Sequence, residues 1–195
     1  MQVIRDWYPH WSSAAIHESS PATRGTSPRL ARDCSGYVAS QYDPALPWGQ
    51  ESADGTYRSE DLERQTFPDA TFDLVITQDV FEHIFDIDAA FREIARTLRP
   101  GGAHIFTTPL VNGPRPTEAW ARRHEDGSIE HLEEPEYHGN PMDQDGGSLV
   151  TWHFGYDLAD RIRHACGLDT TIVLLDDLGR GLRAEFLEVM VTTKP

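Results

Sequence analysis

Cysteine and long apolar runs are scarce in this chain of 195 residues. The two cysteines, Cys34 and Cys166, lie far apart in sequence and form no Cys-x-x-Cys pair, so we expect ordinary reduced thiols. No apolar stretch approaches the roughly 20 residues of a membrane helix, and the chain is not expected to meet a membrane. The first residues, MQVIRDWYPHW, lack the apolar centre of a signal peptide, which favours a cytoplasmic location.

Positive charge is scarce as well. Lysine and arginine number 17 against 32 acidic residues, and the formal net charge is −15. A field of this sign repels phosphate backbones, so we expect no nucleic-acid partner. It favours a neutral or cationic small substrate only weakly, because most carboxylates of such a chain are solvated surface groups. The length suits one domain, and nothing in the sequence indicates an oligomeric state.

The most regular pattern lies between Phe72 and Pro109. The run FDLVIT is apolar and β-branched, as in a strand covered on both faces. From Asp86 to Leu98 the period becomes helical, with an expected cap at Asp86 and a stop at Pro100-Gly101-Gly102. The segment AHIFTTP then predicts the next strand. Strand, helix and strand in this order predict a right-handed crossover.

The same alternation continues more faintly on both sides. Upstream, we predict strands at residues 13–16, 36–40 and 56–58 and a helix at residues 28–34. Downstream, a helix begins at Asp157 and ends at Gly167, and two strands, TTIVLL and EFLEVMVTT, follow around the turn DDLGRG. Strands joined by so short a link are antiparallel neighbours. The sequence therefore predicts an α/β sheet, mostly parallel, with an antiparallel pair at its end.

Residues 110–150 interrupt this pattern. The stretch is rich in proline and glycine and shows little periodicity. Such a long irregular segment in a compact domain is usually a lid or a binding loop. Its run EYHGNPM, Glu136 to Met142, places directional polar groups on a turn, as a lid that contacts substrate would; a rigid loop with its own packing is the alternative. We therefore predict one domain over residues 1–195 with an insertion at 110–150.

Residues 60–109 resemble the class I S-adenosylmethionine-dependent methyltransferases that act on small molecules. The resemblance is carried by EDLERQTFPDATFDLVITQDVFEHIFD and FREIARTLRPGG, in the order and spacing of that family. It implies a Rossmann-like, mostly parallel seven-stranded sheet with an antiparallel last strand, order 3-2-1-4-5-7-6, and helices on both faces. It also implies S-adenosyl-L-methionine as cofactor and methyl transfer to an oxygen or nitrogen atom.

The chain departs from the family at two places. The first strand of the family usually ends in a glycine-rich turn that lets the backbone approach the methionine part of the cofactor. Here the corresponding text is IHESSPATRG. The second strand usually ends in an acid that accepts hydrogen bonds from the ribose, and here the equivalent is Gln41. A similar glycine-free turn occurs within the family, so the resemblance still implies cofactor binding. The residues expected to bind the cofactor are His17, Glu18, Gln41, Asp61, Leu62, Gln78 and Asp79.

Two histidines are the candidates for chemistry. His83 follows the fourth strand, beside the point where the strand order reverses, and its unperturbed pKa of about 6.5 suits a base near neutrality. The alternative is that Glu82-His83 caps the next helix. His138, in the insertion, is expected to contact substrate. We expect no metal, although a site from His17, Glu18, His83 and His138 is conceivable if the lid folds over the pocket.

Three functions remain open at this point. The first is transfer of a methyl group from S-adenosylmethionine to a small molecule. The second is a relative that has lost the cofactor and serves as a binding or scaffold subunit, which the altered turn and Gln41 would explain. The third is a metal-assisted enzyme on the same fold.

Overall fold

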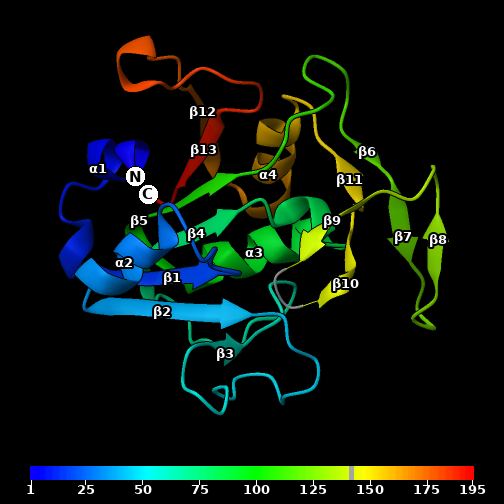
Figure 1. Cartoon of the computed structure of the whole chain (residues 1–195), viewed down its shortest axis with the longest axis horizontal. Coiled ribbons are helices and arrows are strands. Elements are labelled where there is room, and N and C mark those ends of the chain that lie inside the picture. Colours follow the sequence, from blue (N-terminus) through cyan, green and yellow to red (C-terminus); the bar gives the residue numbers. More distant parts are fainter. Residues whose placement is uncertain (141–142) are drawn as a thin grey trace.

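The computed structural model describes residues 1–140 and 143–195 and is built around a seven-stranded sheet (Figure 1). The strand order is β12-β13-β5-β4-β1-β2-β3. The strands are β1 (Ala15–Ser19), β2 (Gly36–Gln41), β3 (Arg58–Ser59), β4 (Phe72–Gln78), β5 (Leu98–Thr107), β12 (Asp169–Leu174) and β13 (Glu188–Thr193). Read from the other edge, this is the order that the resemblance implied, so the predicted fold class is confirmed.

The directions of the strands also match the prediction. Strands β3, β2, β1, β4 and β5 are parallel, and β13 is antiparallel both to β5 and to β12. The central strand β4 is buried along almost its whole length, which explains its continuous apolar run. The link between β12 and β13 holds the short helix η3 (Leu178–Arg180).

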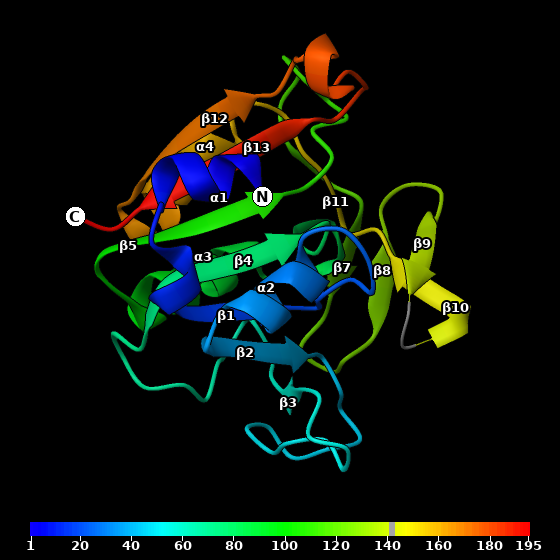
Figure 2. The ribbon, with the colours of Figure 1, turned by 60° about the vertical axis from the view of Figure 1, so that its left-hand side comes forward.

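Helices cover the sheet on both faces (Figure 2). On one face, α1 (Gln2–Trp7) and α2 (Ser27–Asp33) pack with residues such as Ile4 and Leu30 in one apolar cluster. On the other face, α3 (Ile87–Thr97) and α4 (Leu158–Cys166) contribute Phe91 and Ile162 to a second cluster. The sheet therefore lies between two apolar layers. Helix α1, and the short helix η1 (Trp11–Ser13) after it, were not predicted.

The sequence predicts that α3 begins at a cap, Asp86, and that α4 begins at Asp157. The carboxylate of Asp86 accepts a hydrogen bond from the backbone N–H of Ala89 at 2.9 Å, so α3 is capped as predicted. Asp157 precedes α4, but its carboxylate accepts hydrogen bonds from Thr117 instead of capping the helix. Residues 100–102 lie within β5 instead of before it, because Gly101 and Gly102 exchange backbone hydrogen bonds with Lys194.

The insertion at 110–150 contains more regular structure than the sequence predicts. Three short antiparallel pairs lie in and beside it: β6 (Glu118–Ala119) with β11 (Trp152–His153), β7 (Ala121–Arg123) with β8 (Ile129–His131), and β9 (Tyr137–Asn140) with β10 (Asp143–Leu149). Most of these strands have two to four residues, too few to show a sequence period. They form a lobe beside the carboxyl ends of the central strands (Figure 1). No helix among the described residues has the length and apolar character needed to cross a membrane.

Candidate active site

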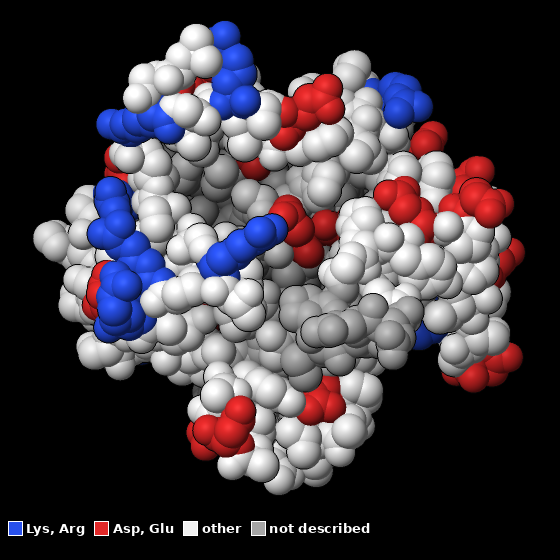
Figure 3. Space-filling view, in the orientation of Figure 1, with Lys and Arg blue, Asp and Glu red and all other residues white. Residues whose placement is uncertain are grey.

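The strand order reverses between β1 and β4, and ligands of open α/β sheets bind beyond the carboxyl ends of the strands at such a point. The segments that leave these two strands are the turn after Ser19 and the short helix η2 (Phe81–His83). Figure 3, a space-filling view in the orientation of Figure 1, shows a hollow near the middle of the molecular surface with acidic side chains in it. The candidate site is therefore placed here.

Glu18, near the end of β1, links the elements around this site through hydrogen bonds. Its carboxylate is fully buried and accepts hydrogen bonds from Ser27 Oγ, Tyr37 Oη and Gln78 Nε2, each at 2.7 Å. These partners come from α2, β2 and β4. Burial raises the pKa of Glu18, while the three hydrogen bonds lower it again. Glu18 and Gln78 thus fasten neighbouring elements to one another, and Glu18 exposes no surface to a ligand.

The turn after β1 retains the backbone shape that a glycine would favour. Ser20 has a φ of 55°, in the left-handed region that non-glycine residues rarely adopt. Its backbone N–H donates to the carbonyl oxygen of Ser40 at 2.8 Å, which closes the turn against β2. The glycine-free sequence therefore still leaves β1 through a left-handed turn.

The position of His17 corrects its expected contact with the cofactor. The ring is completely buried, with Nε2 at 2.8 Å from Ser40 Oγ and Phe67 and Phe72 at centroid distances of 4.9 and 5.1 Å. Burial lowers the pKa of His17 to about 3, so the ring is neutral. His17 is a core residue, because alternation along β1 turns its side chain into the sheet's apolar layer.

The remaining expected cofactor residues lie near the same edge of the sheet. Gln41 ends β2 half-exposed, and its side-chain amide has no hydrogen-bond partner among the described residues. Asp61 and Leu62 are buried just after β3, and the carboxylate of Asp61 accepts from the backbone N–H of Glu63 at 3.0 Å. Asp79 is exposed with a φ of 52° and accepts from Thr107 Oγ1 at 3.0 Å, which joins the ends of β4 and β5.

The structure brings together three side chains that can do chemistry: Glu82, His83 and His138. One oxygen of Glu82, Oε1, lies 3.9 Å from His83 Nε2 and 3.9 Å from His138 Nδ1. The two rings meet edge to face with centroids 5.1 Å apart. His83 and His138 are the two histidines that the sequence selected for chemistry, and Glu82 lies beside them where the conceivable four-residue site had Glu18. His17 and Glu18 are not part of the group.

Glu82 is nearly inaccessible to solvent, with 2% of its surface exposed. Its Oε2 accepts from Thr108 Oγ1 at 2.8 Å, whereas Oε1 has no hydrogen-bond partner among the described residues. Burial raises the pKa of Glu82 to about 7, and burial lowers the pKa of His83. A neutral imidazole and a carboxyl group with a pKa near neutrality are suited to proton exchange at physiological pH.

The tautomer of each ring follows from the hydrogen bond that its outer nitrogen makes. The outer nitrogen carries the proton, and the nitrogen that faces the cluster has a free lone pair. His83 Nδ1 lies 2.9 Å from the carbonyl oxygen of Leu149, which can only accept, so Nδ1 carries the proton and Nε2 has a free lone pair. His138 Nε2 lies 3.1 Å from Glu136 Oε1 and by the same reasoning leaves Nδ1 free. The insertion thus contributes both a ring and the carbonyl that orients the other ring.

The sequence left open whether Glu82-His83 caps the next helix or takes part in chemistry. The helix α3 is capped by Asp86, so neither Glu82 nor His83 caps it. Glu82 is not among the site residues predicted from the sequence, although its place next to His83 after a buried strand was the available signal. Glu136 was quoted only as part of the motif at 136–142, in which Pro141 and Met142 lie outside the described residues.

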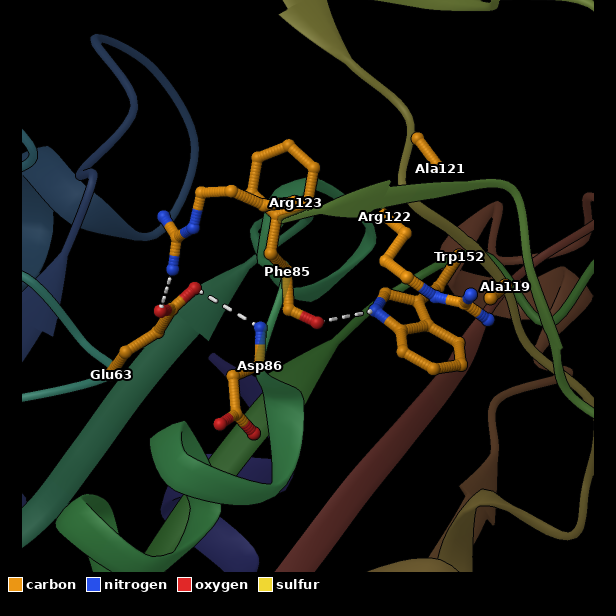
Figure 4. A pocket seen from close by; sticks show the side chains of 8 residues that line it. All are labelled: Glu63, Phe85, Asp86, Ala119, Ala121, Arg122, Arg123 and Trp152. Carbon is orange, nitrogen blue, oxygen red and sulfur yellow. Dashed lines mark hydrogen bonds and ion pairs between the residues drawn. The ribbon is translucent and has the colours of Figure 1, made fainter. Parts of the chain in front are cut away.

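Two cavities adjoin this region. The larger, about 330 Å³, lies between η2 and the insertion and is lined by Glu63, Phe85, Asp86, Ala119, Ala121, Arg122, Arg123 and Trp152 (Figure 4). Arg123 pairs with Glu63, and Trp152 Nε1 donates to the carbonyl of Phe85 at 3.3 Å, so these groups already have partners. The smaller, about 140 Å³, lies between α1 and the ends of β4 and β5. The lining residues of these two cavities do not include Glu82, His83 or His138.

Comparison with known proteins bears on the family and the fold. Residues 25–106 match the family model of a methyltransferase domain. The chain has the sequence signature and the fold of the class I S-adenosylmethionine-dependent methyltransferases. The predicted resemblance is confirmed, and the family and the fold imply S-adenosylmethionine as cofactor.

Three methyltransferase relatives show how far the similarity extends. A sarcosine/dimethylglycine N-methyltransferase of Halorhodospira halochloris is 48% identical over 44 residues, 23% of this chain and 16% of that protein. A wheat (Triticum aestivum) phosphoethanolamine N-methyltransferase is 34% identical over 61 residues, 31% of this chain and 12% of that protein. The chain thus spans a small part of the curated relatives it matches. A methyltransferase structure from Mesorhizobium loti superposes with a TM-score of 0.59 at 15% identity over 98% of this chain and 94% of that one.

The residues at the sheet edge fit S-adenosylmethionine. Ser20, in the turn after β1, has a φ of 55°, a conformation that glycine favours. The side-chain amide of Gln41, which has no partner among the described residues, lies at the end of β2, where the resemblance implies that the ribose binds. Asp61 and Leu62 follow β3 at the adenine end. The chain therefore offers polar groups where the nucleoside part of the cofactor is expected, whereas His17 and Glu18 are buried.

Proposed function

We propose that the chain transfers the methyl group of S-adenosylmethionine to a nitrogen or oxygen atom of a small molecule. The cofactor supplies an activated methyl group, so the protein has to hold a nucleophile in line with it and remove a proton. The observation that supports the proposal is the cluster of Glu82, His83 and His138, which follows β4 near the switch point. Two ring nitrogens without a proton and one carboxylate oxygen lie close together there.

In this proposal Gln41, Asp61 and Leu62 hold the nucleoside, and Glu18, Gln78 and Asp79 keep the surrounding turns in place. An amine or hydroxyl of the substrate at the cluster would donate a hydrogen bond to Nε2 of His83 or Nδ1 of His138. Its proton passes to the cluster as its bond to the methyl carbon forms and the bond between carbon and sulfur breaks. The names of the two curated relatives, both N-methyltransferases, support nitrogen as the acceptor atom.

The first test is binding. Titration calorimetry with S-adenosylmethionine and with its demethylated product should show one site, and Asp61→Ala should weaken it. The second test is transfer of labelled methyl groups to pools of small amines and hydroxyl compounds. His138→Ala should lower transfer while cofactor affinity stays nearly unchanged, with His131→Ala, an exposed histidine of the same insertion, as the matched control. No heat with either compound at millimolar concentration would contradict the proposal and favour a cofactor-free binding subunit.

A further inference from the structure

The cluster of Glu82, His83 and His138 has a property that proton transfer alone leaves unexplained. The three side chains offer ligand atoms within 4.8 Å of one another. The atoms that face inward are Glu82 Oε1, His83 Nε2 and His138 Nδ1, and Oε1 lies 3.9 Å from each of the two ring nitrogens. Each is an acceptor, because the protons of both rings are directed outward, to Leu149 and Glu136. No described side chain donates a hydrogen bond to Oε1 of the buried Glu82. Three lone pairs therefore converge on one point.

We propose that this point binds a divalent transition-metal ion, with Glu82 Oε1, His83 Nε2 and His138 Nδ1 as its protein ligands. Two imidazoles and one carboxylate suit zinc and similar first-row ions, whereas magnesium and calcium prefer oxygen ligands alone. The sequence led us to expect no metal, and this inference revises that expectation. It rests on the proposed function and changes one step of it: the ion occupies the lone pairs of His83 and His138, so it activates the nucleophile in their place and the substrate's proton goes to solvent.

The surroundings of the cluster resemble the outer shell of a metal site. A metal-bound histidine usually donates its second N–H to a carbonyl or a carboxylate, which fixes the ring and raises its basicity. His83 donates in this way to the carbonyl of Leu149 at 2.9 Å, and His138 to Glu136 at 3.1 Å. Thr108 Oγ1 donates to Oε2 of Glu82 at 2.8 Å and leaves Oε1 for the ion. Each ligand therefore has its own supporting hydrogen bond.

The distances require only a small contraction. Zinc binds nitrogen and oxygen at about 2.0–2.2 Å, so two of its ligands stand roughly 3–3.5 Å apart. Oε1 of Glu82 is 3.9 Å from each ring nitrogen. His138 lies on the short strand β9 with 38% of its side chain exposed, so it can move the required distance on the order of 1 Å. Glu82 Oε1 and His83 Nε2, on adjacent residues of η2, must approach each other by a similar amount through side-chain rotation.

Three protein ligands leave coordination positions open for a substrate atom. A hydroxyl bound there would be acidified by the ion, would lose its proton to solvent, and would present an oxygen lone pair to the methyl carbon. An amine has one lone pair and must keep it for the methyl carbon, so an amine substrate would bind the ion through a neighbouring carboxylate or hydroxyl oxygen. This predicts substrates with a coordinating group beside the methylated atom, such as an amino acid or a hydroxy acid.

The test uses the full-length protein after treatment with a chelator, without S-adenosylmethionine. Zinc titrated by calorimetry should bind with one-to-one stoichiometry, and cobalt(II) should give visible absorption typical of nitrogen and oxygen ligands. Glu82→Gln, which keeps the shape and the Thr108 contact, and His138→Ala should each weaken zinc binding by more than about 100-fold, and Glu136→Gln by about 10- to 100-fold.

His124→Ala is the control, because His124 pairs with Glu130 at 3.3 Å on the exposed part of the same insertion. It should leave zinc affinity unchanged. Wild-type protein that binds no zinc at one-to-one stoichiometry, or that binds it equally well in Glu82→Gln and His138→Ala, would overturn the inference. Melting temperatures verify that the variants are folded. Cofactor titrations run separately: zinc binding without cofactor binding refutes only the proposed function, and methyl transfer without zinc binding refutes only this inference.

Discussion

The two histidines buried in the sheet, His17 and His104, make the folded protein sensitive to acid. His104, on β5, is 1% exposed, stacks on Phe106 with centroids 4.3 Å apart, and lies 3.0 Å from Thr77 Oγ1. Burial lowers the pKa of each ring from 6.5 to about 3, and for His17 the nearby charge of Arg58 adds a smaller effect in the same direction. Replacing His104 by glutamine removes one titrating ring and keeps a polar group near Thr77.

Because these pKa values are lowered in the folded protein, the free energy of unfolding falls as the pH falls. Between pH 6.5 and about pH 3 the unfolded chain binds a proton on each ring and the folded chain does not. The contribution of the two neutral rings to the free energy of unfolding is therefore fully present above pH 6.5 and is lost as the pH falls. One pH unit changes the free energy of unfolding by about 1.4 kcal/mol per ring. At pH 5 the two rings together cost about 4 kcal/mol, a large part of the stability of an ordinary domain.

Chemical denaturation between pH 5 and pH 6.5 measures this effect, since the free energy of unfolding can be plotted against pH. We expect His104→Gln to reduce the slope by about 1.4 kcal/mol per pH unit relative to wild type, while the exposed His131→Gln leaves it unchanged. The raised pKa values of Glu18 and Glu82 act in the opposite direction, but they cancel in the difference between variant and wild type. Equal slopes in wild type and His104→Gln would refute the reasoning.

Three further predictions concern catalysis, cofactor binding and folding. His83→Ala should lower single-turnover methyl transfer by about 10²- to 10⁴-fold with unchanged cofactor affinity; a wild-type rate would remove His83 from the mechanism. Gln41→Ala should weaken cofactor binding by about two- to twelve-fold in calorimetry, the equivalent of one hydrogen bond, and unchanged affinity would place the ribose elsewhere. Asp86→Ala should lower the free energy of unfolding by about 1 kcal/mol through loss of the α3 cap, without affecting turnover of the folded protein.

The central elements could be predicted because their patterns are local. The apolar run in β4, the helical period of α3 and the cap at Asp86 each lie within a few residues, and the structure confirms them. The strands of the insertion were missed because they are too short to show a period, and their pairing depends on partners elsewhere in the chain. Helix α1 was missed for a similar reason: with six residues, it depends on packing against the sheet.

By itself, the sequence determined the parallel sheet, its antiparallel end and the position of the site beside β1 and β4, since burial on both faces and short links restrict how these strands pair. Only the tertiary structure decided what the site contains. It buried His17 among phenylalanines, occupied the carboxylate of Glu18 with three donors, and joined Glu82 and His83 to His138 from a distant segment. The direction of a ring's lone pair depends on its outer hydrogen bond, and here the partners of both rings, Leu149 and Glu136, come from the folded insertion.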